Sequence, residues 1–401
     1  MYFIGEEEIE AVRRVIESRQ LFRYRGGEGG ETDHFEEEFS EKIGISHTIA
    51  VTSGTAALIC GLAGMGIGPG DEVIVPGYTF MATALAPLAV GAVPVIAEID
   101  ESLTLDPEDL VEKISPRTKA VIPVHMMGLP CDMDSIGNIC SERGIMVLED
   151  CCQAIGGSYG GRRLGSLGEA GAFSFNQFKI ISCGEGGAIT TGNDLIHQRA
   201  LMYHDGGCVF RDHADEMGIP FFAGSNFRIN EILSAILRVQ LGRLDGILEN
   251  LRQEKALMSE ELAGEDAFDL SPVNDVEGQC ATTLALNFDS PSSVRSVLEN
   301  LSEREIGAST PIDSGRHVYE NWDPIMDKHG AHHPDYDAFN LTDFPPEYAP
   351  DMCPNTLKIL KQTVFISTSP TRKPEETMDL VGEIKRAGHE VGPKRLRALQ
   401  K

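Results

Sequence analysis

The sequence is poor in basic residues. Lysine and arginine together number 34 against 62 aspartate and glutamate residues in a chain of 401, which gives a formal net charge of −28 at pH 7. An excess of negative charge of this size repels phosphate backbones and anionic lipid head groups. We therefore expect neither nucleic acid nor a membrane among the partners of this chain.

Long apolar runs and cysteine pairs with metal-binding spacing are also missing. No uninterrupted apolar run reaches membrane-spanning length. The nine cysteines are scattered through apolar stretches and include no C-x-x-C pair, which argues against a disulfide framework and against a zinc site. The beginning of the chain, MYFIGEEEIEAVRRVIESRQ, has the pattern of an acidic amphipathic helix and not that of a signal peptide. These features predict a cytoplasmic protein with reduced thiols and no metal.

Short β-rich runs alternate with helical stretches from residue 48 to residue 192. Each of three strand-like runs is followed by a helical run: DEVIVPGYTF by MATALAPLAVG, AVPVIAEID by PEDLVEKI, and KAVIPVHMMG by MDSIGNICSERG. Alternation at this spacing predicts a largely parallel sheet with helices on both faces. Residues 231–262 then have the apolar periodicity of one long helix, with Gly242 as a candidate kink.

The length of the chain favours two domains. Residues 265–401 are richer in proline, aspartate and polar turns, and they contain isolated strand-like pieces such as TTLALNF and QTVFIST. We place the boundary near residue 248. A large domain would then span residues 1–248, including the N-terminal helix, and a smaller α+β domain would span residues 249–401.

A single lysine, Lys179, stands in the stretch FSFNQFKIISCGEGGA (173–188), which is otherwise apolar and glycine-rich. Removing a lysine from water is costly unless the amine is paired or neutralised. A desolvated lysine has a distinctive use, because its amine becomes nucleophilic and forms Schiff bases with carbonyl groups. The ordinary alternative is a surface lysine whose stem lies along apolar neighbours.

Residues that follow the predicted strands are candidates for a site, because ligands of open parallel sheets bind beyond the carboxyl ends of the strands. Ser53, Gly54 and Thr55 open a helix whose backbone N–H groups would suit a phosphate, although a simple N-cap explains them equally well. Phe80 follows a strand and would stack on a planar ligand or pack in the core. Asp150 ends the apolar run IMVLE and needs a cationic or N–H partner, or else is a capping residue.

One ligand, pyridoxal 5'-phosphate, uses all of these groups. Lys179 would form the imine, and Asp150 would hold the proton of the pyridinium nitrogen. The segment 53–55 with Ser174 would bind the phosphate, and Phe80 would cover the ring. Asp150 would then make the ring an electron sink for the carbanion of the substrate, and Lys179 would carry the substrate proton as general base and acid.

Five segments of the chain match a known family in order and spacing. They are SGTAAL (53–58), GDEVIVPGYTF (70–80), LEDCCQAIG (148–156), FSFNQFKIISCGEGGAITT (173–191) and GSNFRINEILSAI (224–236). With them the chain resembles the DegT/DnrJ/StrS family of pyridoxal-phosphate-dependent sugar aminotransferases. The resemblance implies the α/β architecture of fold type I, in which a mostly parallel mixed sheet flanked by helices is followed by a smaller C-terminal α+β domain.

The resemblance also implies roles for individual residues. Lys179 resembles the Schiff-base lysine and Asp150 the pyridinium partner, while Gln153 would lie near the ring hydroxyl. Gly54, Thr55 and Ser174, with Ser53, would hold the phosphate, and Phe80 would stack on the ring. Asn226 resembles an asparagine that reaches the phosphate of the neighbouring subunit. This last role implies a homodimer with shared active sites.

The activity implied by the resemblance is transfer of an amino group from glutamate or glutamine to a keto sugar. The product would be an amino sugar for a glycan, a lipopolysaccharide or a natural product. Alternatives are a cyclitol aminotransferase, a pyridoxal-phosphate-dependent sugar dehydratase and a non-catalytic regulatory or ligand-binding α/β protein. Related dehydratases replace the lysine with histidine, so Lys179 favours transamination.

The surroundings of the lysine depart from the common family pattern. Many members have His-Pro-Thr-Lys-Asn there, whereas this chain has Asn176-Gln177-Phe178-Lys179-Ile180. The pattern looks more like members that act on cyclitols or on unactivated keto sugars. The segments QLFRYR, EIDESLTLDPE, VHMMG and VYENWDPI are similar to the aminotransferase that makes 8-amino-3,8-dideoxy-octulosonate.

Residues that contact the substrate are harder to predict. Arg23 and Tyr24, together with Arg25, lie in a glycine-rich segment that could fold over the site. His125 follows a strand and is expected to face the ligand, with a hydrogen-bonded loop histidine as the alternative. Arg228 is another candidate, with a surface arginine as the alternative. Other residues considered are Trp322 with His317 and Tyr319, where domain packing is favoured, and His332-His333, expected to be an exposed pair.

Overall fold

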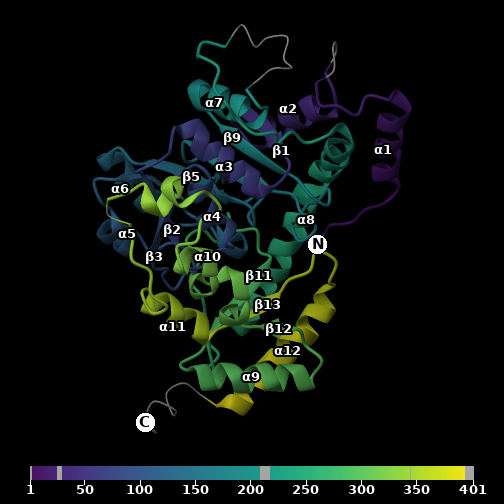
Figure 1. Cartoon of the computed structure of the whole chain (residues 1–401). Helices are drawn as coiled ribbons and strands as arrows, with labels where there is room; N and C mark the ends of the chain where they lie inside the picture. The colour runs from purple at the N-terminus through teal and green to yellow at the C-terminus, as the bar shows by residue number, and fades with distance from the viewer. Residues whose placement is uncertain (1, 25–28, 208–216, 344, 393–401) are drawn as a thin grey trace.

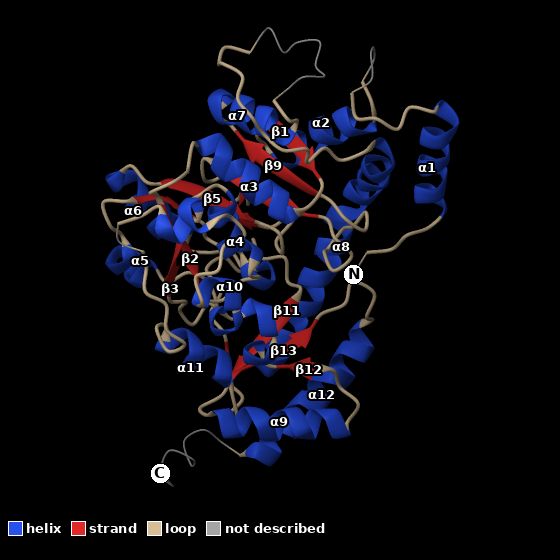
Figure 2. Cartoon of the chain, in the orientation of Figure 1, coloured by secondary structure: helices blue, strands red, loops and turns tan. Residues whose placement is uncertain are grey.

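The computed structural model describes residues 2–24, 29–207, 217–343 and 345–392. A seven-stranded sheet, in the order β1-β9-β8-β5-β4-β2-β3, lies at the centre of the larger part of the molecule (Figure 2). Strands β2, β3, β4, β5 and β8 run parallel, whereas β9 is antiparallel to both β8 and β1. The strands are β1 (His47–Val51), β2 (Glu72–Pro76), β3 (Val93–Ala97), β4 (Thr118–Val121), β5 (Met146–Asp150), β8 (Ala170–Ser174) and β9 (Gly187–Thr191).

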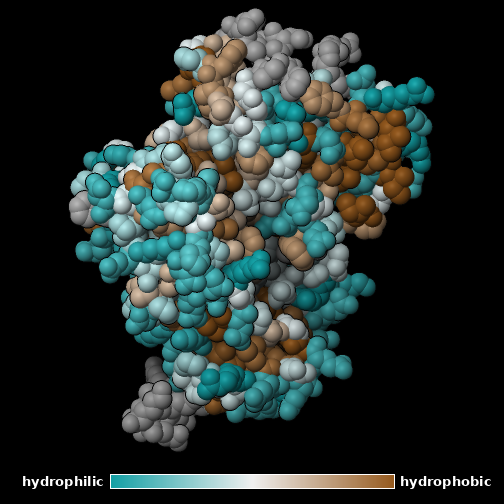
Figure 3. Space-filling model, viewed as in Figure 1, coloured by the Kyte–Doolittle hydropathy of each residue, from teal (hydrophilic) through white to brown (hydrophobic). Residues whose placement is uncertain are grey.

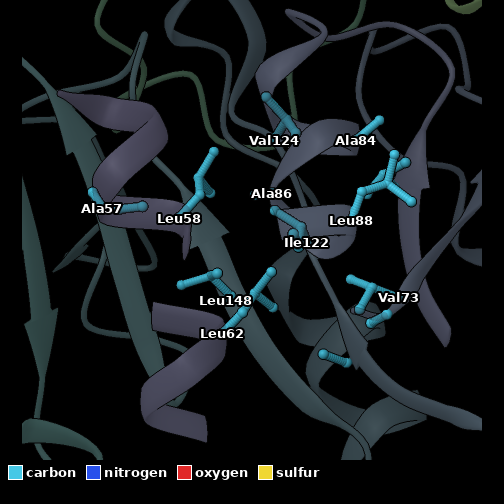
Figure 4. Close-up of a cluster of buried hydrophobic side chains, with 14 of the residues drawn as sticks. Ala57, Leu58, Leu62, Val73, Ala84, Ala86, Leu88, Ile122, Val124 and Leu148 are labelled. Carbon is cyan, nitrogen blue, oxygen red and sulfur yellow. The ribbon is translucent and has the colours of Figure 1, made fainter. Parts of the chain in front are cut away.

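Helices cover both faces of this sheet, because successive strand residues point to opposite sides. On β5, Leu148 packs with α3 (Gly54–Met65), α4 (Ala82–Ala89) and α7 (Asp194–His204), and Figure 4 shows Leu148 near Leu58 and Leu62 of α3. Val147 packs on the opposite face. That face is covered by α2 (Glu31–Ile43), α5 (Pro107–Lys113), α6 (Met133–Arg143) and the first half of α8 (Glu231–Leu262). The predicted α/β sandwich is confirmed.

Local sequence signals fix the ends of the helices. Ser53 accepts a hydrogen bond from the backbone N–H of Ala56 and so caps α3, which ends at Gly66 with φ at 80°. Asp132 caps α6 in the same way, and Gly144, with φ at 66°, ends it. Both capping residues lie at the edge of the sheet where the parallel strands end, so both helices begin at that edge.

Helix α8 connects the two halves of the molecule (Figure 1). Its 32 residues form one uninterrupted helix, so Gly242 does not divide it, and a kink at this residue stays a prediction. A Cβ at Gly242 would have no atom within 4 Å, while Leu241, Leu244 and Leu248 are buried and hold the helix against the core. The boundary predicted near residue 248 falls within this helix. The division into two domains stays a proposal.

The C-terminal part of the chain forms an antiparallel sheet in the order β10-β11-β13-β12. The predicted strands in TTLALNF and QTVFIST are confirmed as its two central strands. The elements are β10 (Asp269–Leu270), β11 (Thr283–Asn287), β12 (Ala308–Ser309), β13 (Thr363–Ser367), α9 (Pro291–Glu303), α10 (Asp323–Met326), α11 (Pro354–Gln362) and α12 (Pro374–Val391), with the 3-10 turns η3 (Pro311–Asp313), η4 (Gly315–His317), η5 (Tyr319–Asn321), η6 (Pro334–Tyr336) and η7 (Ala338–Asn340). The core of this part joins α9, α12 and the end of α8 to the sheet.

The N-terminal helix α1 (Glu6–Ser18) packs through Ala11 and Val15 against α8. Its other face leaves Ile9 and Ile16 about half exposed, and Figure 3 shows an apolar patch over this helix. Small elements complete the described chain: a hairpin of β6 (Ser158–Tyr159) and β7 (Arg162–Arg163), and η1 (Met126–Gly128). No helix in the described ranges combines the length and the apolar character needed to cross a membrane.

Candidate active site

Eight of the nine residues predicted to bind the cofactor line a single pocket. It lies beyond the carboxyl ends of the parallel strands and encloses about 120 Å³. The eight residues are Ser53, Gly54, Thr55, Phe80, Asp150, Gln153, Ser174 and Lys179. A second cavity of about 220 Å³ shares Gln153 and Lys179 with this pocket and continues toward the C-terminal sheet.

Lys179 lies on a tight turn between β8 and β9. Asn176 closes this turn, because its carbonyl oxygen accepts from the Lys179 N–H at 3.1 Å and its side chain accepts from the Phe178 N–H at 3.0 Å. The apolar residues on either side of the turn are buried beneath the sheet: Phe173, Phe175, Ile180 and Ile181. Phe178 is 78% exposed, and Lys179 is half-buried with its side chain at the pocket. The apolar stretch therefore anchors the turn and does not enclose the amine.

Asp150 is the last residue of β5 and is only 4% exposed. One carboxylate oxygen accepts from the Thr83 hydroxyl at 2.8 Å, and the other accepts from the Cys152 N–H at 3.0 Å. A carboxylate has about four acceptor positions, so these two contacts orient it and leave room for another donor. This arrangement suits a ring N–H that must keep its proton.

The N-terminus of α3 forms one end of the pocket. The side chain and the carbonyl of Ser53 accept from Ala56 and Ala57, whereas nothing among the described residues accepts from the backbone N–H groups of Gly54 and Thr55. Unsatisfied N–H groups at a helix N-terminus attract phosphate. With the hydroxyl of Ser174 in the same wall, they form an anion cradle.

The anion cradle requires a residue without a side chain at Gly54. A Cβ at this position would lie 2.7 Å from Cys152 Sγ and 2.8 Å from Ser174 Cβ. Only glycine therefore lets the start of α3 approach β8 this closely. Burial raises the pKa of the Cys152 thiol well above its usual value, so a neutral thiol stands beside the cradle.

The aromatic wall is formed by Phe80, which is 44% exposed. Its ring lies 5.4 Å from the ring of His317, with an interplanar angle of 54°. Gln153 stands at the boundary of the two cavities, and its side-chain oxygen accepts from the Met127 N–H at 3.1 Å. The amide of Gln153 is therefore held at the junction of the two cavities, and its role beside a ring hydroxyl stays a prediction.

His125 does not face the pocket, contrary to expectation. Val124 lines the pocket, and the next side chain points into the core, where His125 is fully buried. Its Nδ1 accepts from the Cys131 N–H at 3.1 Å, so Nε2 carries the proton and donates to Glu149 at 3.2 Å. With Cys151, these two residues form a cluster of metal-ligand types within 4.8 Å of one another. Both imidazole nitrogens are already engaged in hydrogen bonds.

The arginines predicted to contact the substrate have structural partners. Arg23 is 1% exposed, and it donates to the carboxylate of Glu36 at 2.5 Å and to the carbonyl of Ala50 at 3.3 Å. Arg228 forms an ion pair with the buried Asp205 at 2.5 Å. Neither side chain lines the cofactor pocket or the cavity beside it, and a contact of either with the substrate stays a prediction.

The remaining candidates lie outside the pocket. The hydroxyl of Tyr24 is 3.4 Å from Nε2 of His204, and Arg25 lies outside the described residues. Asn226 is exposed and pairs through its backbone with Asp205. Its role at a neighbouring subunit stays a prediction. Trp322 is fully buried and donates to the carbonyl of Arg316 at 2.9 Å, as expected for a packing residue.

The sequence analysis missed several residues of the pocket wall. Thr83 binds Asp150 and is itself 2.8 Å from the hydroxyl of Thr79. The available signal was weak, because Thr83 lies in the first turn of α4 whereas Thr79 precedes that helix. Asn176, Glu185 and Cys152 also line the pocket.

The donor set fits pyridoxal 5'-phosphate, which is the cofactor indicated by the family. Lys179 offers the amine, Asp150 an acceptor for the ring nitrogen, and Phe80 an aromatic wall. The N–H groups of Gly54 and Thr55 supply the phosphate cradle. When bound, the cofactor supplies an electron sink that stabilises a carbanion at the substrate carbon next to nitrogen.

Known relatives support this assignment. The chain is 40% identical over 235 residues to the 3-amino-5-hydroxybenzoate synthase of Amycolatopsis mediterranei (strain S699), which covers 58% of this chain and 59% of the relative. It is 40% identical over 237 residues to the dTDP-3-amino-3,4,6-trideoxy-alpha-D-glucose transaminase of Streptomyces venezuelae, with 59% of this chain and 60% of the relative covered. These matches therefore span less than two thirds of the relatives' lengths.

Solved structures match over nearly the whole chain. The crystal structure of a 3-amino-5-hydroxybenzoic acid synthase has a TM-score of 0.79 at 29% identity and covers 97% of both chains. A family model matches residues 3–385 of this sequence. The chain therefore belongs to the DegT/DnrJ/EryC1/StrS aminotransferase family.

Proposed function

We propose that this protein transfers an amino group from glutamate or glutamine to a keto sugar and so makes an amino sugar. The observation that carries the proposal is the single pocket in which the amine of Lys179, the buried carboxylate of Asp150 and an anion cradle at α3 converge. Relatives of this chain are named for amino sugars, among them GDP-perosamine and a dTDP-linked aminotrideoxyglucose.

Each of the residues in the pocket has its own role in the proposed reaction. Asp150 keeps the ring nitrogen protonated, because its carboxylate is buried and oriented by Thr83. Lys179 would take a proton from the substrate carbon next to nitrogen as general base, and as general acid it would return the proton to the carbon on the other side of that nitrogen. Phe80 covers the site against water, and the helix N-terminus holds the phosphate in place.

A cyclitol is the second candidate acceptor. The chain is 37% identical over 247 residues to an L-glutamine:2-deoxy-scyllo-inosose aminotransferase of Streptomyces kanamyceticus. The sequence around the lysine, NQFKI, also departs from the common family pattern in the direction of such enzymes. A sugar dehydratase is less well supported, because Lys179 is retained. The octulosonate subgroup and the cytoplasmic location stay predictions.

We also infer a homodimer with shared active sites. Asn226 is exposed and lies outside the pocket of its own chain. This position suits a contact from Asn226 of the partner subunit to the phosphate. Sedimentation of the wild type and of Asn226→Ala, with cofactor affinity measured for both, would test the inference. A monomer with full cofactor affinity would contradict it.

The visible absorption spectrum of the protein with added pyridoxal phosphate tests the proposed activity. We expect a band from the lysine-bound cofactor that disappears when L-glutamate is added and returns with a suitable keto sugar. Lys179→Ala should lack the lysine-dependent band and lose activity by several orders of magnitude, since the imine-forming amine is gone. A wild-type band that ignores both amino donors, or an active Lys179→Ala, would overturn the proposal.

A further inference from the structure

The cavity beside the cofactor pocket has walls of two kinds. Apolar side chains form one wall: Met127, Phe178 and Ile180. Thr283 and Ser367 form another, and they are direct partners in the antiparallel pairing of β11 with β13, so both side chains lie on the same face. A sugar ring has the same division into C–H faces and hydroxyl edges. Lys179 is the one lysine or arginine among the lining residues, and no carboxylate is among them.

His317 lines this cavity together with Lys179. Its Nδ1 lies 3.2 Å from the carbonyl oxygen of Ser314. A carbonyl can only accept, so Nδ1 carries the proton and Nε2 carries the lone pair. No described residue is hydrogen-bonded to Nε2. Desolvation, together with the nearby amine of Lys179, lowers the pKa of His317, and the contact with Ser314 opposes this shift only in part.

The segment that carries His317 is held rigidly against the cofactor wall. The N–H groups of Thr79 and Met81 donate to the carbonyls of His317 and Arg316, at 2.9 and 3.0 Å. The loop between them is the one that presents Phe80. The imidazole is therefore fixed relative to the aromatic wall, as a residue that positions a substrate must be.

We propose that His317 contacts the acceptor substrate, and that its unprotonated Nε2 accepts a hydrogen bond from a hydroxyl group of an uncharged sugar or cyclitol ring in this cavity. The inference rests on the proposed aminotransferase function and adds a residue that distinguishes the two substrates. Glutamate has no hydroxyl donor, and its carboxylates gain nothing from a lone pair. The contrast holds for glutamate and not for glutamine, because the side-chain amide of glutamine is itself an N–H donor. His317 therefore serves the acceptor half of the reaction and not the donor half.

Chemical modification of the holoenzyme tests the availability of Nε2 directly. Diethyl pyrocarbonate acylates unprotonated imidazole nitrogens, and peptide mass spectrometry locates the product. We expect His317 to react at neutral pH and to be protected by 3-amino-3-deoxy-D-glucose or GDP-perosamine, but not by glutamate. Failure of His317 to react, while the exposed His333 does, would overturn the inference.

Half-reactions measured by cofactor absorption give the functional test. For His317→Phe we expect about a tenfold rise in the KM of whichever of the two amino sugars converts the wild type, as for one lost neutral hydrogen bond, with the glutamate half-reaction unchanged within threefold. His317→Gln, which keeps an acceptor oxygen, should recover most of this loss. His333→Gln, at a histidine that is 68% exposed, is the matched control.

The outcomes separate the two claims. Equal slowing of both half-reactions by His317→Phe would overturn the role of His317 as an acceptor-side residue. A wild-type band that ignores glutamate and glutamine would contradict the proposed function instead.

Discussion

Glu149 and Asp150 are neighbours on β5 with opposite uses. Glu149 is fully buried, and its carboxylate accepts from the N–H groups of Gly165, Leu167 and Gly168 at 2.7–2.8 Å and from His125. Asp150 is 4% exposed and has one side-chain donor and one backbone donor. The acceptor positions of Glu149 are thus occupied by donors of the fold, whereas Asp150 has acceptor positions left for a ligand.

The pleat of the strand produces this difference. Asp150 shares its face with Leu148, which packs on α3, while Glu149 points to the face of Val147. A buried carboxylate is stable only when hydrogen-bond donors surround it. On the face of Glu149 the protein supplies these donors, whereas on the face of Asp150 it supplies two and leaves positions for a ligand. Substitutions at the two positions should therefore separate stability from catalysis.

Glu149→Gln should have the largest effect on the free energy of unfolding. The amide N–H₂ would confront the N–H of Gly165 and the Nε2–H of His125, and each buried unsatisfied donor costs about 1–3 kcal/mol. We expect a loss of about 3–5 kcal/mol in denaturant unfolding, with near-normal activity per folded molecule. Glu142→Gln, at a glutamate that is 74% exposed, is the control and should change stability by less than about 0.5 kcal/mol. Equal stabilities of the two variants would refute the structural role.

Asp150→Asn should have the converse effect. Asparagine preserves the size of the side chain but cannot stabilise a protonated ring nitrogen. We expect kcat to fall by about 10²–10³-fold or more, as for loss of one preorganised electrostatic partner, while the unfolding midpoint moves little. Single-turnover kinetics with glutamate would measure the chemical step. A variant that keeps more than a tenth of wild-type kcat would show that Asp150 is not the pyridinium partner.

The sequence carried enough information to bring eight of the residues predicted to bind the cofactor into one pocket. The strand pattern predicted which edge of the sheet holds Asp150, and the helix start at SGTAAL predicted the anion cradle. His125 was misplaced for a specific reason. It follows Val124, the residue that does line the pocket, and one step along an extended chain reverses the direction of a side chain.

The second wall of the site was not predicted, because the sequence placed His317 only in a group of residues for which domain packing was favoured. His317 reaches Lys179 because a C-terminal segment pairs with the loop that carries Phe80, and no local pattern encodes that pairing. The same holds for Arg23, whose charge suggested a ligand but whose partner, Glu36, lies on α2. Long-range contacts of this kind depend on how the elements pack, and residue spacing along the chain does not predict them.

Thr83→Val offers the finest test of the contrast on β5. Asp150 depends on a side-chain donor, the Thr83 hydroxyl at 2.8 Å, whereas the carboxylate of Glu149 is held mainly by backbone donors that a side-chain truncation does not remove. Valine matches threonine in shape and removes this hydrogen bond together with the one between the hydroxyls of Thr83 and Thr79. A hydrogen bond to a charged group contributes about 1.5–3 kcal/mol, so we expect kcat to fall by about ten- to a hundredfold, a smaller loss than in Asp150→Asn.

In a double-mutant cycle the two losses should not add, because Thr83 acts only through Asp150. Thr371→Val, at an exposed position in the turn between β13 and α12, should leave kcat unchanged. Full additivity would mean that Thr83 contacts the cofactor or substrate directly, and that orientation of Asp150 does not depend on its hydroxyl.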